Sequence, residues 1–212
     1  VRQVASTIAC DEYSEDRLRS ILPSLRAHFV DRDDLGNIQS LLLKGGVRVV
    51  LVEGLPGSKI DGVCLWINNQ PVIDLPNRLD RLDNLCIVLR HEIEHILRGD
   101  GREETFMPID EFDGEQSYGE KGLPEAEIIA NKAAAEFCVS QELLASFVAR
   151  KSPFISEKDV LLFARRVEIN PAIIVGQIQY RTKKFNWLRK YQSSVRSHIL
   201  EWEAVDGWGT AA

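Results

Sequence analysis

The order of hydrophobic patterns along the chain predicts an α+β fold, in which a small mixed β-sheet packs on a central helix and further helices flank it. Three observations support this prediction. Apolar residues recur at three-to-four spacing before residue 45, short β-branched runs follow between residues 47 and 75, and helical spacing returns from residue 85 onward. This order is typical of an α+β domain with one core.

The N-terminal segment, residues 1–44, predicts two helices separated by a polar stretch at residues 31–36. Neither helix carries obvious chemistry. Their apolar positions are Leu18, Ile21, Leu22 and Leu25 in the first helix, and Ile38, Leu41, Leu42 and Leu43 in the second.

Three strands are expected next in the chain. Val47–Val52 is short and β-branched, and Asp61–Ile67 and Pro71–Leu75 are separated by Asn68-Asn69, a pair that favours a tight turn.

The most informative segment is His91-Glu-Ile-Glu-His95, an H-E-x-x-H motif within the apolar helical stretch Leu85–Leu97. Residues four apart lie on one face of a helix, so both imidazoles can bind the same metal ion. Glu92 is placed to accept a proton from a water on that metal, as a general base. A chance surface pair is the competing interpretation, but two of only 4 histidines occur here between apolar flanks.

A catalytic zinc ion usually takes three protein ligands, and Glu127 is the best candidate for the third. It opens the predicted helix Glu127–Phe137, which follows Pro124. Three alanines at 133–135 make this helix thin enough to lie close to the histidines. We therefore expect the sheet to pack on an H-E-x-x-H helix and a Glu-bearing helix, with Zn²⁺ as the cofactor.

Other candidate ligands are weaker. Glu125 and Glu136 belong to the same segment and are the alternatives to Glu127, each expected to be a solvated helix charge. The cysteines are far apart, without a C-x-x-C pair, and are expected to be ordinary buried thiols: Cys10, Cys64, Cys86 and Cys138.

Composition limits the remaining possibilities. The chain has 212 residues, of which 44% are hydrophobic, so it can bury one substantial core. It shows no apolar run long enough for a bilayer, which predicts a cytoplasmic protein without a membrane partner. A net charge of -6 disfavours direct nucleic acid binding. A basic cluster near the C-terminus is expected to be a solvated face: Arg181, Lys183, Lys184, Arg189 and Lys190.

Three further segments have expectations based on their local sequence pattern. The acidic stretch between residues 99 and 124 is expected to cover the cleft, to steer a basic substrate or to be a solvated excursion. Residues 156–179 predict helices with a break at Asn170-Pro171. Residues 188–212 are expected to form a C-terminal helix and tail.

Several stretches between residues 45 and 187 together resemble the ImmA/IrrE family of metallopeptidases, in particular the form fused behind an XRE-type helix-turn-helix in HigA-like antitoxins. The order of elements is also that of zincin peptidases. In these peptidases a sheet edge beside the metal can hold an extended peptide through its main chain, so the likeness implies that Asp61–Ile67 or Pro71–Leu75 supplies this edge. The matching stretches are Val49–Gly57 with Ile60–Gly62, Asp80–Asn84 leading into His91–His95, Glu127–Asn131, and Asn170–Gln179.

This resemblance implies a zincin-like fold and a zinc metalloendopeptidase domain at residues 45–187, with His91, His95 and Glu127 as gluzincin-like ligands and Glu92 as general base. It implies a protein substrate, such as a transcriptional repressor or a toxin, under stress control, and a helix-turn-helix module that is fused upstream of Val1 or separate. The alternative is a non-catalytic zinc-binding sensor or interaction domain of an antitoxin-type regulator.

Two positions depart from the family pattern. Glu94 precedes the second histidine, where relatives often have Gly or Ala, so packing and charge near the metal are expected to differ. Tyr180 stands where relatives often have His. The donor for the developing oxyanion is therefore unassigned, with Tyr180 and His198 as candidates.

Overall fold

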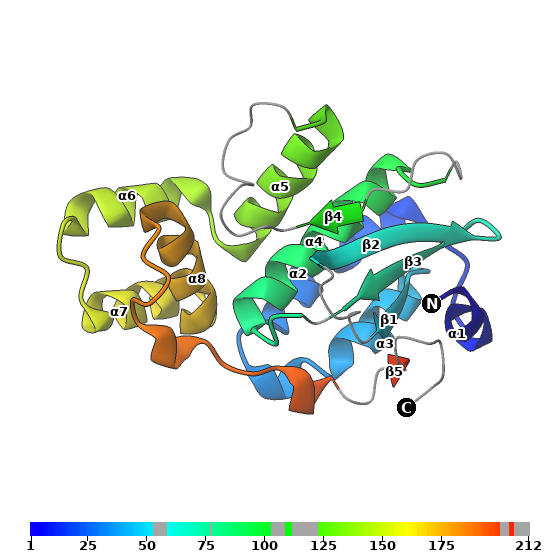
Figure 1. Cartoon of the computed structure of the whole chain (residues 1–212), viewed down its shortest axis with the longest axis horizontal. Coiled ribbons are helices and arrows are strands. Elements are labelled where there is room, and N and C mark those ends of the chain that lie inside the picture. The colour runs from blue at the N-terminus through cyan, green and yellow to red at the C-terminus, as the bar shows by residue number, and fades with distance from the viewer. Residues whose placement is uncertain (53–58, 77, 103–108, 112–122, 200–203, 206–212) are drawn as a thin grey trace.

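The structure, a computed structural model, describes residues 1–52, 59–76, 78–102, 109–111, 123–199 and 204–205. It is mixed α+β, as the hydrophobic pattern predicts (Figure 1). The first half contains the helices α1 (Arg2–Thr7), α2 (Glu15–Ala27) and α3 (Asn37–Lys44), the 3₁₀ turn η1 (Arg32–Asp34), and the strands β1 (Arg48–Val52), β2 (Ile60–Ile67) and β3 (Gln70–Leu75).

The second half is mainly helical. Its longest helix, α4, contains the H-E-x-x-H motif, and the break predicted at Asn170-Pro171 separates α7 from α8. The elements are α4 (Leu82–Arg98), β4 (Ile109–Glu111), α5 (Glu125–Cys138), α6 (Gln141–Lys151), α7 (Glu157–Val167), α8 (Pro171–Thr182), the 3₁₀ turns η2 (Arg189–Tyr191) and η3 (Arg196–His198), and β5 (Ala204–Val205).

The sheet is mixed, with strand order β4-β2-β3-β1-β5. β1 pairs in parallel with β3, while β2 and β3 form an antiparallel hairpin whose turn places Asn68 and Asn69 at φ 50° and 62°. The expectation that β2 or β3 forms a sheet edge is wrong. β1 pairs on the far side of β3, and the short strand β4, which falls in the acidic stretch, pairs antiparallel with β2.

The main core lies between the sheet, α4 and the N-terminal helices. Leu18 and Leu25 of α2 and Leu42 of α3 are fully buried in the same cluster as Ile73 of β3 and Leu89 of α4. Residues before position 45 therefore share one core with the later elements. A second, smaller cluster covers another part of the sheet, where α1 packs on β1, β2 and β3 through Val4, Ala5, Val50, Leu65 and Val72.

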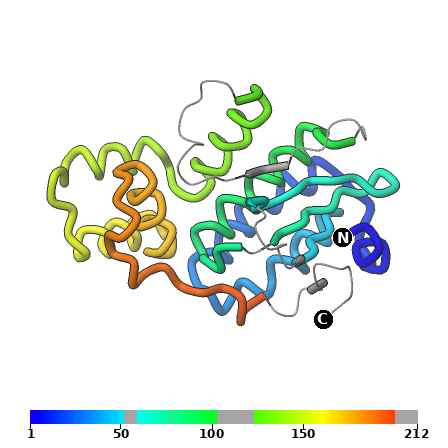
Figure 2. The backbone as a smooth tube through the Cα atoms, in the orientation of Figure 1, coloured from blue at the N-terminus to red at the C-terminus, as the bar shows by residue number. Residues whose placement is uncertain are grey.

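The segment after α8 differs from the expectation. Instead of a C-terminal helix, the described residues after position 188 form the short turns η2 and η3 and the strand β5, which pairs with β1. Figure 2 shows the described part of this segment passing the start of α4, where the Leu82 amide donates to the Ser193 carbonyl. Asp80 anchors the segment at the start of η3, because its carboxylate accepts hydrogen bonds from the Ser194 hydroxyl and from the amides of Val195 and Arg196.

Several expected features lie outside the described residues. They are most of the acidic stretch, residues 53–57 of the stretch Val49–Gly57, and residues 206–212 of the expected tail. Among the helices that are described, none combines the length and the apolar character needed to cross a bilayer.

Asp74 of β3 provides a test of the sheet. Its neighbours across the sheet are Val50 and Val63, and burial raises the pKa of its carboxyl to about 7. Because the folded protein holds this proton more tightly than the unfolded chain, the group stabilises the fold fully below about pH 4, and this contribution is lost as the pH rises to about 7.

We expect Asp74→Asn to match the wild type near pH 4 and to exceed its free energy of unfolding at pH 8 by up to about 4 kcal/mol, because the pKa is raised from 3.8 to about 7 and each pKa unit corresponds to about 1.4 kcal/mol. Urea unfolding at several pH values would measure the difference. A difference that stays constant from pH 4 to pH 8 would contradict the raised pKa.

Candidate metal centre

Helix α4 holds both motif histidines inside the protein. Its apolar residues pack into the main core, and it ends at Gly99, whose left-handed conformation (φ 77°) terminates the helix. His91 is 1% exposed and His95 is 0% exposed. Polar rings so deeply buried need partners, and these come from α5 and from the residue that follows Gly99.

Helix α5 runs antiparallel to α4 and brings Glu127 to the histidines. The direction follows from two contacts: Glu127, near the start of α5, meets the second half of α4, while the Cys138 and Cys86 sulfurs lie 3.0 Å apart at the other ends of the two helices. Ala130 and Ala134 are fully buried on the same face of α5 as Glu127. These small side chains allow the two helices to approach closely, as the alanine-rich sequence predicts.

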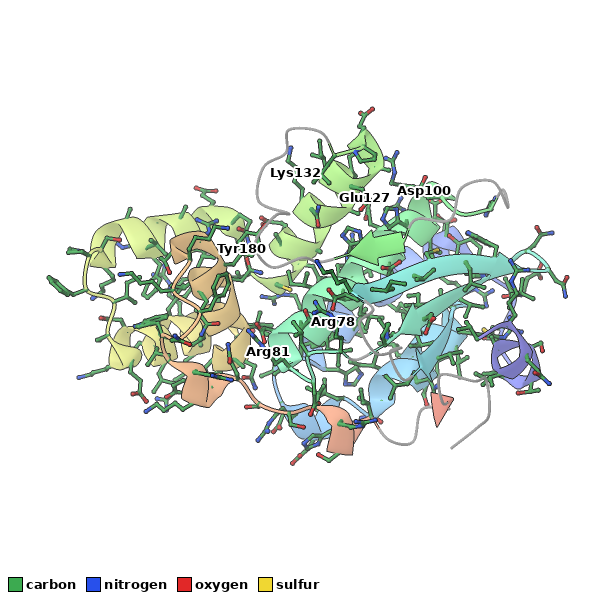
Figure 3. All side chains as sticks on the ribbon, in the orientation of Figure 1. Arg78, Arg81, Asp100, Glu127, Lys132 and Tyr180 are labelled. Atoms are coloured by element: carbon green, nitrogen blue, oxygen red, sulfur yellow. The ribbon has the colours of Figure 1, made fainter. Side chains whose placement is uncertain are left out.

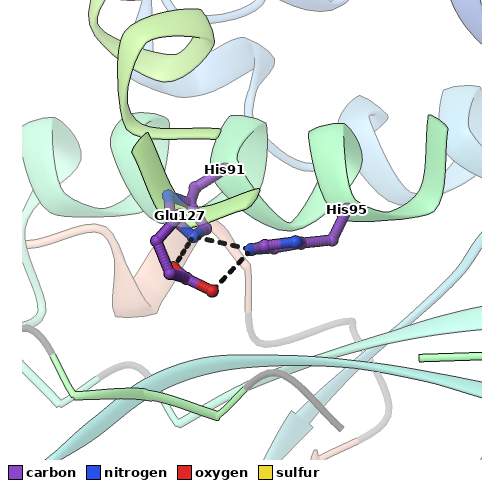
Figure 4. A group of neighbouring side chains, drawn as sticks. All are labelled: His91, His95 and Glu127. Atoms are coloured by element: carbon purple, nitrogen blue, oxygen red, sulfur yellow. Dashed lines mark hydrogen bonds and ion pairs between the residues drawn. The ribbon is translucent and has the colours of Figure 1, made fainter. Parts of the chain in front are cut away.

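The three candidate ligands converge on one point (Figure 4). The Nε2 atoms of His91 and His95 are 3.0 Å apart, and they lie 3.2 Å and 3.4 Å from the nearest carboxylate oxygens of Glu127. In a tetrahedral zinc site with bonds of about 2.0–2.1 Å, neighbouring ligand atoms are about 3.3–3.4 Å apart. The spacing of these donors therefore fits a metal ion, and this group could hold one.

The rivals of Glu127 lie elsewhere. Glu125 and Glu136 are both exposed, and the Glu136 carboxylate accepts a hydrogen bond from the backbone amide of Gln141. Glu127 differs because it occupies the face of α5 that packs on α4, where its side chain is only 15% exposed.

Asp100 is a site residue that sequence reasoning missed. Its Oδ2 lies 3.0 Å from His95 Nδ1, so a ring that is protonated at Nδ1 donates to this carboxylate and directs Nε2 toward the other ligands. The signal was Gly99: the left-handed turn there brings the chain back onto α4, and the Asp100 amide donates to the His95 carbonyl. Trp66 fixes Asp100 further by donating to its carbonyl.

The electrostatics around His95 follow from these contacts. Burial lowers the pKa of the ring, but hydrogen bonds to Glu127 and Asp100 outweigh burial, and the pKa is raised above its ordinary value. Two carboxylates therefore direct negative charge toward this imidazole, and the same negative charge would favour a bound cation.

Glu92 lies on the sheet-facing side of α4, next to the ligands. It is fully buried, and a Cβ atom added at Gly62 of β2 would lie only 2.4 Å from its Oε1 and 2.7 Å from Val88. Only glycine leaves room for the carboxylate at this point. This contact gives a physical reason for the glycine at the end of the stretch Ile60–Gly62.

Glu94, the departure from the family pattern, is neutralised within α4. Its carboxylate forms an ion pair of 2.6 Å with Arg90 one turn earlier, and both side chains are mostly buried. The guanidinium of Arg90 also lies 6.0 Å from the ring centre of Phe137 on α5. The charge of Glu94 is therefore compensated by Arg90 of the same helix.

The candidates for oxyanion donor lie in different places. His198 Nδ1 lies 3.5 Å from the Asp33 carboxylate, so this residue belongs to the contact between η3 and η1. Tyr180 lies on α8 beside a cavity, where burial raises the pKa of its hydroxyl. The four cysteines are free thiols, Cys10 is partly exposed, and the candidate metal group contains none of them.

In comparisons with known proteins, no family model and no curated protein sequence matched this chain. The likeness to ImmA/IrrE metallopeptidases consequently rests on the stretches quoted above. What the geometry itself establishes is a buried group of two histidines and one glutamate that could hold a metal ion.

Removing Glu127 tests the group directly. We expect the wild type, loaded with zinc and desalted, to retain about one ion per chain, and Glu127→Ala to lose it because two imidazoles alone leave the site incomplete. Elemental analysis measures the content. Glu125→Ala, a change at an exposed carboxylate on the same helix, is the matched control and should keep the ion. Zinc retained by Glu127→Ala would place the third ligand elsewhere.

Asp100 allows a second test of the same geometry. Asp100→Ala removes the acceptor that orients His95, so we expect zinc affinity to fall by about 10–100-fold. Asp100→Asn keeps an acceptor oxygen and should fall less. Competition with a chromogenic chelator measures both, with the exposed Asp16→Ala as control. Equal affinities of Asp100→Ala and wild type would refute the orienting role.

Proposed function

We propose that residues 45–187 form a zinc-dependent metalloendopeptidase domain with a zincin-like fold, of the ImmA/IrrE type. The observation that carries this proposal is the convergence of His91, His95 and Glu127 at ligand spacing, beside the buried carboxylate of Glu92. The sequence stretches that resemble the family support it independently of the geometry.

The donor set suits zinc in its catalytic form. Two imidazole nitrogens and one carboxylate are ligands that zinc takes, and the three donors found among the described residues would leave one position open, whereas a structural zinc ion usually has four protein ligands. When bound, zinc would act as a Lewis acid that polarises the scissile carbonyl and lowers the pKa of a water toward about 7.

The residues of the site would have three different roles: holding the ion, orienting a ligand and transferring a proton. His91 and His95 would hold the zinc ion through Nε2, and Asp100 accepts a hydrogen bond from the His95 ring in the orientation that this would require. The carboxylate of Glu92, held between α4 and Gly62, accepts the proton of the attacking water and passes it to the leaving amine. The reaction is hydrolysis of a peptide bond.

The sheet offers a place for the substrate main chain. β4 is the outermost strand on the side of β2, and β2 lies against α4 through Gly62. An extended peptide that adds to β4 would run beside the metal group, in the strand-addition mode of recognition. We infer a protein substrate, such as a transcriptional repressor, with DNA binding left to a fused or separate helix-turn-helix module.

Glu92→Gln tests the chemistry. We expect this variant to keep its zinc and to lose about 10²–10⁴-fold in the rate of peptide cleavage, because the amide cannot accept the proton. The assay is digestion of a proteome-derived peptide library by zinc-loaded protein, followed by mass spectrometry of the new termini. Glu125→Gln, at an exposed position, is the control and should cleave like the wild type.

Two results would count against the proposal. Full activity of a zinc-loaded Glu92→Gln would exclude Glu92 as the base. A wild type that holds zinc stoichiometrically but cleaves no peptide in the library would favour the alternative, a non-catalytic zinc-binding sensor or interaction domain.

A further inference from the structure

Two of the four cysteines meet at the contact between α4 and α5. The Sγ atoms of Cys86 on α4 and Cys138 on α5 are 3.0 Å apart, although the two residues are 52 positions apart in the chain. Both side chains are fully buried, and both thiols are free. A disulfide bond is about 2.03–2.05 Å long, so the two sulfurs need to approach by only about 1 Å to form one.

The cysteine pair lies at the opposite end of the helix contact from the candidate metal group. Cys86 precedes His91 on α4, whereas Cys138 follows Glu127 on the antiparallel helix α5. Cys138 also lies four residues after the buried Ala134, on the face of α5 that packs on α4. A bond between the two sulfurs would therefore fasten α4 to α5 at a second point, away from the ligands.

A cavity brings solvent within one helical turn of the pair. Its volume is about 520 Å³, and its walls come from the first half of α4, the second half of α5, and α8 with the turn that follows it. Ala135 lines it and precedes Cys138 by three residues, which is about 4.5 Å along the helix axis. Tyr180, which also lines it, is 40% exposed, so the cavity is open to small solutes.

Figure 3 shows the side of the molecule on which this cavity opens. Two of its lining residues, Arg81 and Tyr180, lie toward α8, whereas Asp100 lies at the other end of α4. A small oxidant that enters here therefore approaches the cysteine end of the helix contact.

Burial keeps the pair reduced under ordinary conditions. Burial and the hydrogen bond that Cys138 donates raise the pKa of the Cys86 thiol well above its ordinary value. The guanidinium of Arg26, which donates to the Phe137 carbonyl, opposes this rise only in part. Because the thiolate is the reactive form, the pair reacts slowly and needs sustained exposure to an oxidant.

We propose that Cys86 and Cys138 form a modification site, at which hydrogen peroxide converts two thiols into a disulfide that fastens α4 to α5. One sulfur attacks the peroxide, so that the O–O bond breaks, an S–O bond forms and one water leaves, which gives a sulfenic acid. The second sulfur attacks the first, so that the S–S bond forms, the S–O bond breaks and the hydroxyl leaves with the thiol proton as water. Two electrons pass from the thiols to one peroxide, which is reduced to two waters.

Peptide mapping of the wild-type chain tests the site without any substitution. The zinc-free protein is treated with hydrogen peroxide, remaining thiols are alkylated in denaturant, and a digest made without reductant is analysed by mass spectrometry. We expect a cross-linked peptide pair that joins Cys86 to Cys138, lacks two hydrogen atoms and disappears on reduction.

Three results of the map would overturn the site. They are recovery of both cysteines as alkylated thiols after treatment that oxidises the partly exposed Cys10, conversion of the two to separate sulfinic acids, and a bond from either of them to Cys10 or Cys64.

The fastening of the helices is measured as stability and as zinc release. A bond between residues 52 positions apart restricts the unfolded chain, so the oxidised protein should have a Tm at least about 5 °C above that of the reduced protein. Oxidised protein that is then loaded with zinc should lose the ion to excess chelator several-fold more slowly, since α5 keeps Glu127 beside α4. Dithiothreitol should reverse both effects.

Matched variants assign these effects to the pair. Cys86→Ser should show neither effect after peroxide treatment, and Cys138→Ser serves as the second variant if Cys86→Ser folds poorly. Cys64→Ser, which removes another fully buried thiol, is the control and should show both effects.

The outcomes also separate this site from the proposed function. A protein that carries the bond but keeps the Tm and the zinc release of the reduced form would overturn the fastening. Formation of the bond, with both effects, in a protein that cleaves no peptide would uphold this site and reject the peptidase.

Discussion

Two imidazoles and a carboxylate can share one buried site only because α4 and α5 approach each other closely. Desolvating these groups costs free energy that hydrogen bonds or a metal ion must offset. The fully buried Ala130 and Ala134 permit the approach, and Glu127 extends from the same face of α5 to both histidines. Bulkier residues at these two positions would separate the helices and with them the three ligands.

The same helix pair also links the metal group to its surroundings. Beyond the ligands, the facing sides of α4 and α5 open into the cavity that α8 closes, and Gly176 lets α8 pack against Asp83. Residues from two stretches that are distant in the chain, Asp80–Asn84 and Asn170–Gln179, therefore meet around this cavity. Both stretches form part of the cavity wall, and neither contributes a ligand to the candidate metal group.

The side of α4 that carries Glu92 faces the sheet, and Gly62 of β2 lies against it there. Gly62 leaves the space that the Glu92 carboxylate occupies. The position of this candidate base therefore depends on the packing of β2 on α4 as well as on the motif. At the end of α4, Gly99 turns the chain so that Asp100 reaches His95. The site thus depends on helix packing at one face, sheet packing at another, and one helix terminus.

The sequence by itself determined the features that depend on local periodicity. The α+β class, the strand pair around Asn68-Asn69 and the placement of His91 and His95 on one helix follow from spacings of two to four residues. Glu127 was favoured over Glu125 on sequence grounds, and the geometry places it with the histidines.

Only the tertiary structure decided the rest, because it depends on contacts between segments far apart in the chain. No local pattern shows that β3 becomes a central strand or that β5 joins β1. In place of the expected C-terminal helix, the described residues after position 188 form two short 3₁₀ turns and a strand, and Asp80, more than a hundred positions earlier, binds the backbone at the start of η3. The roles of Asp100, of Gly62 and of the cavity likewise arise only when helices, sheet and turns pack together.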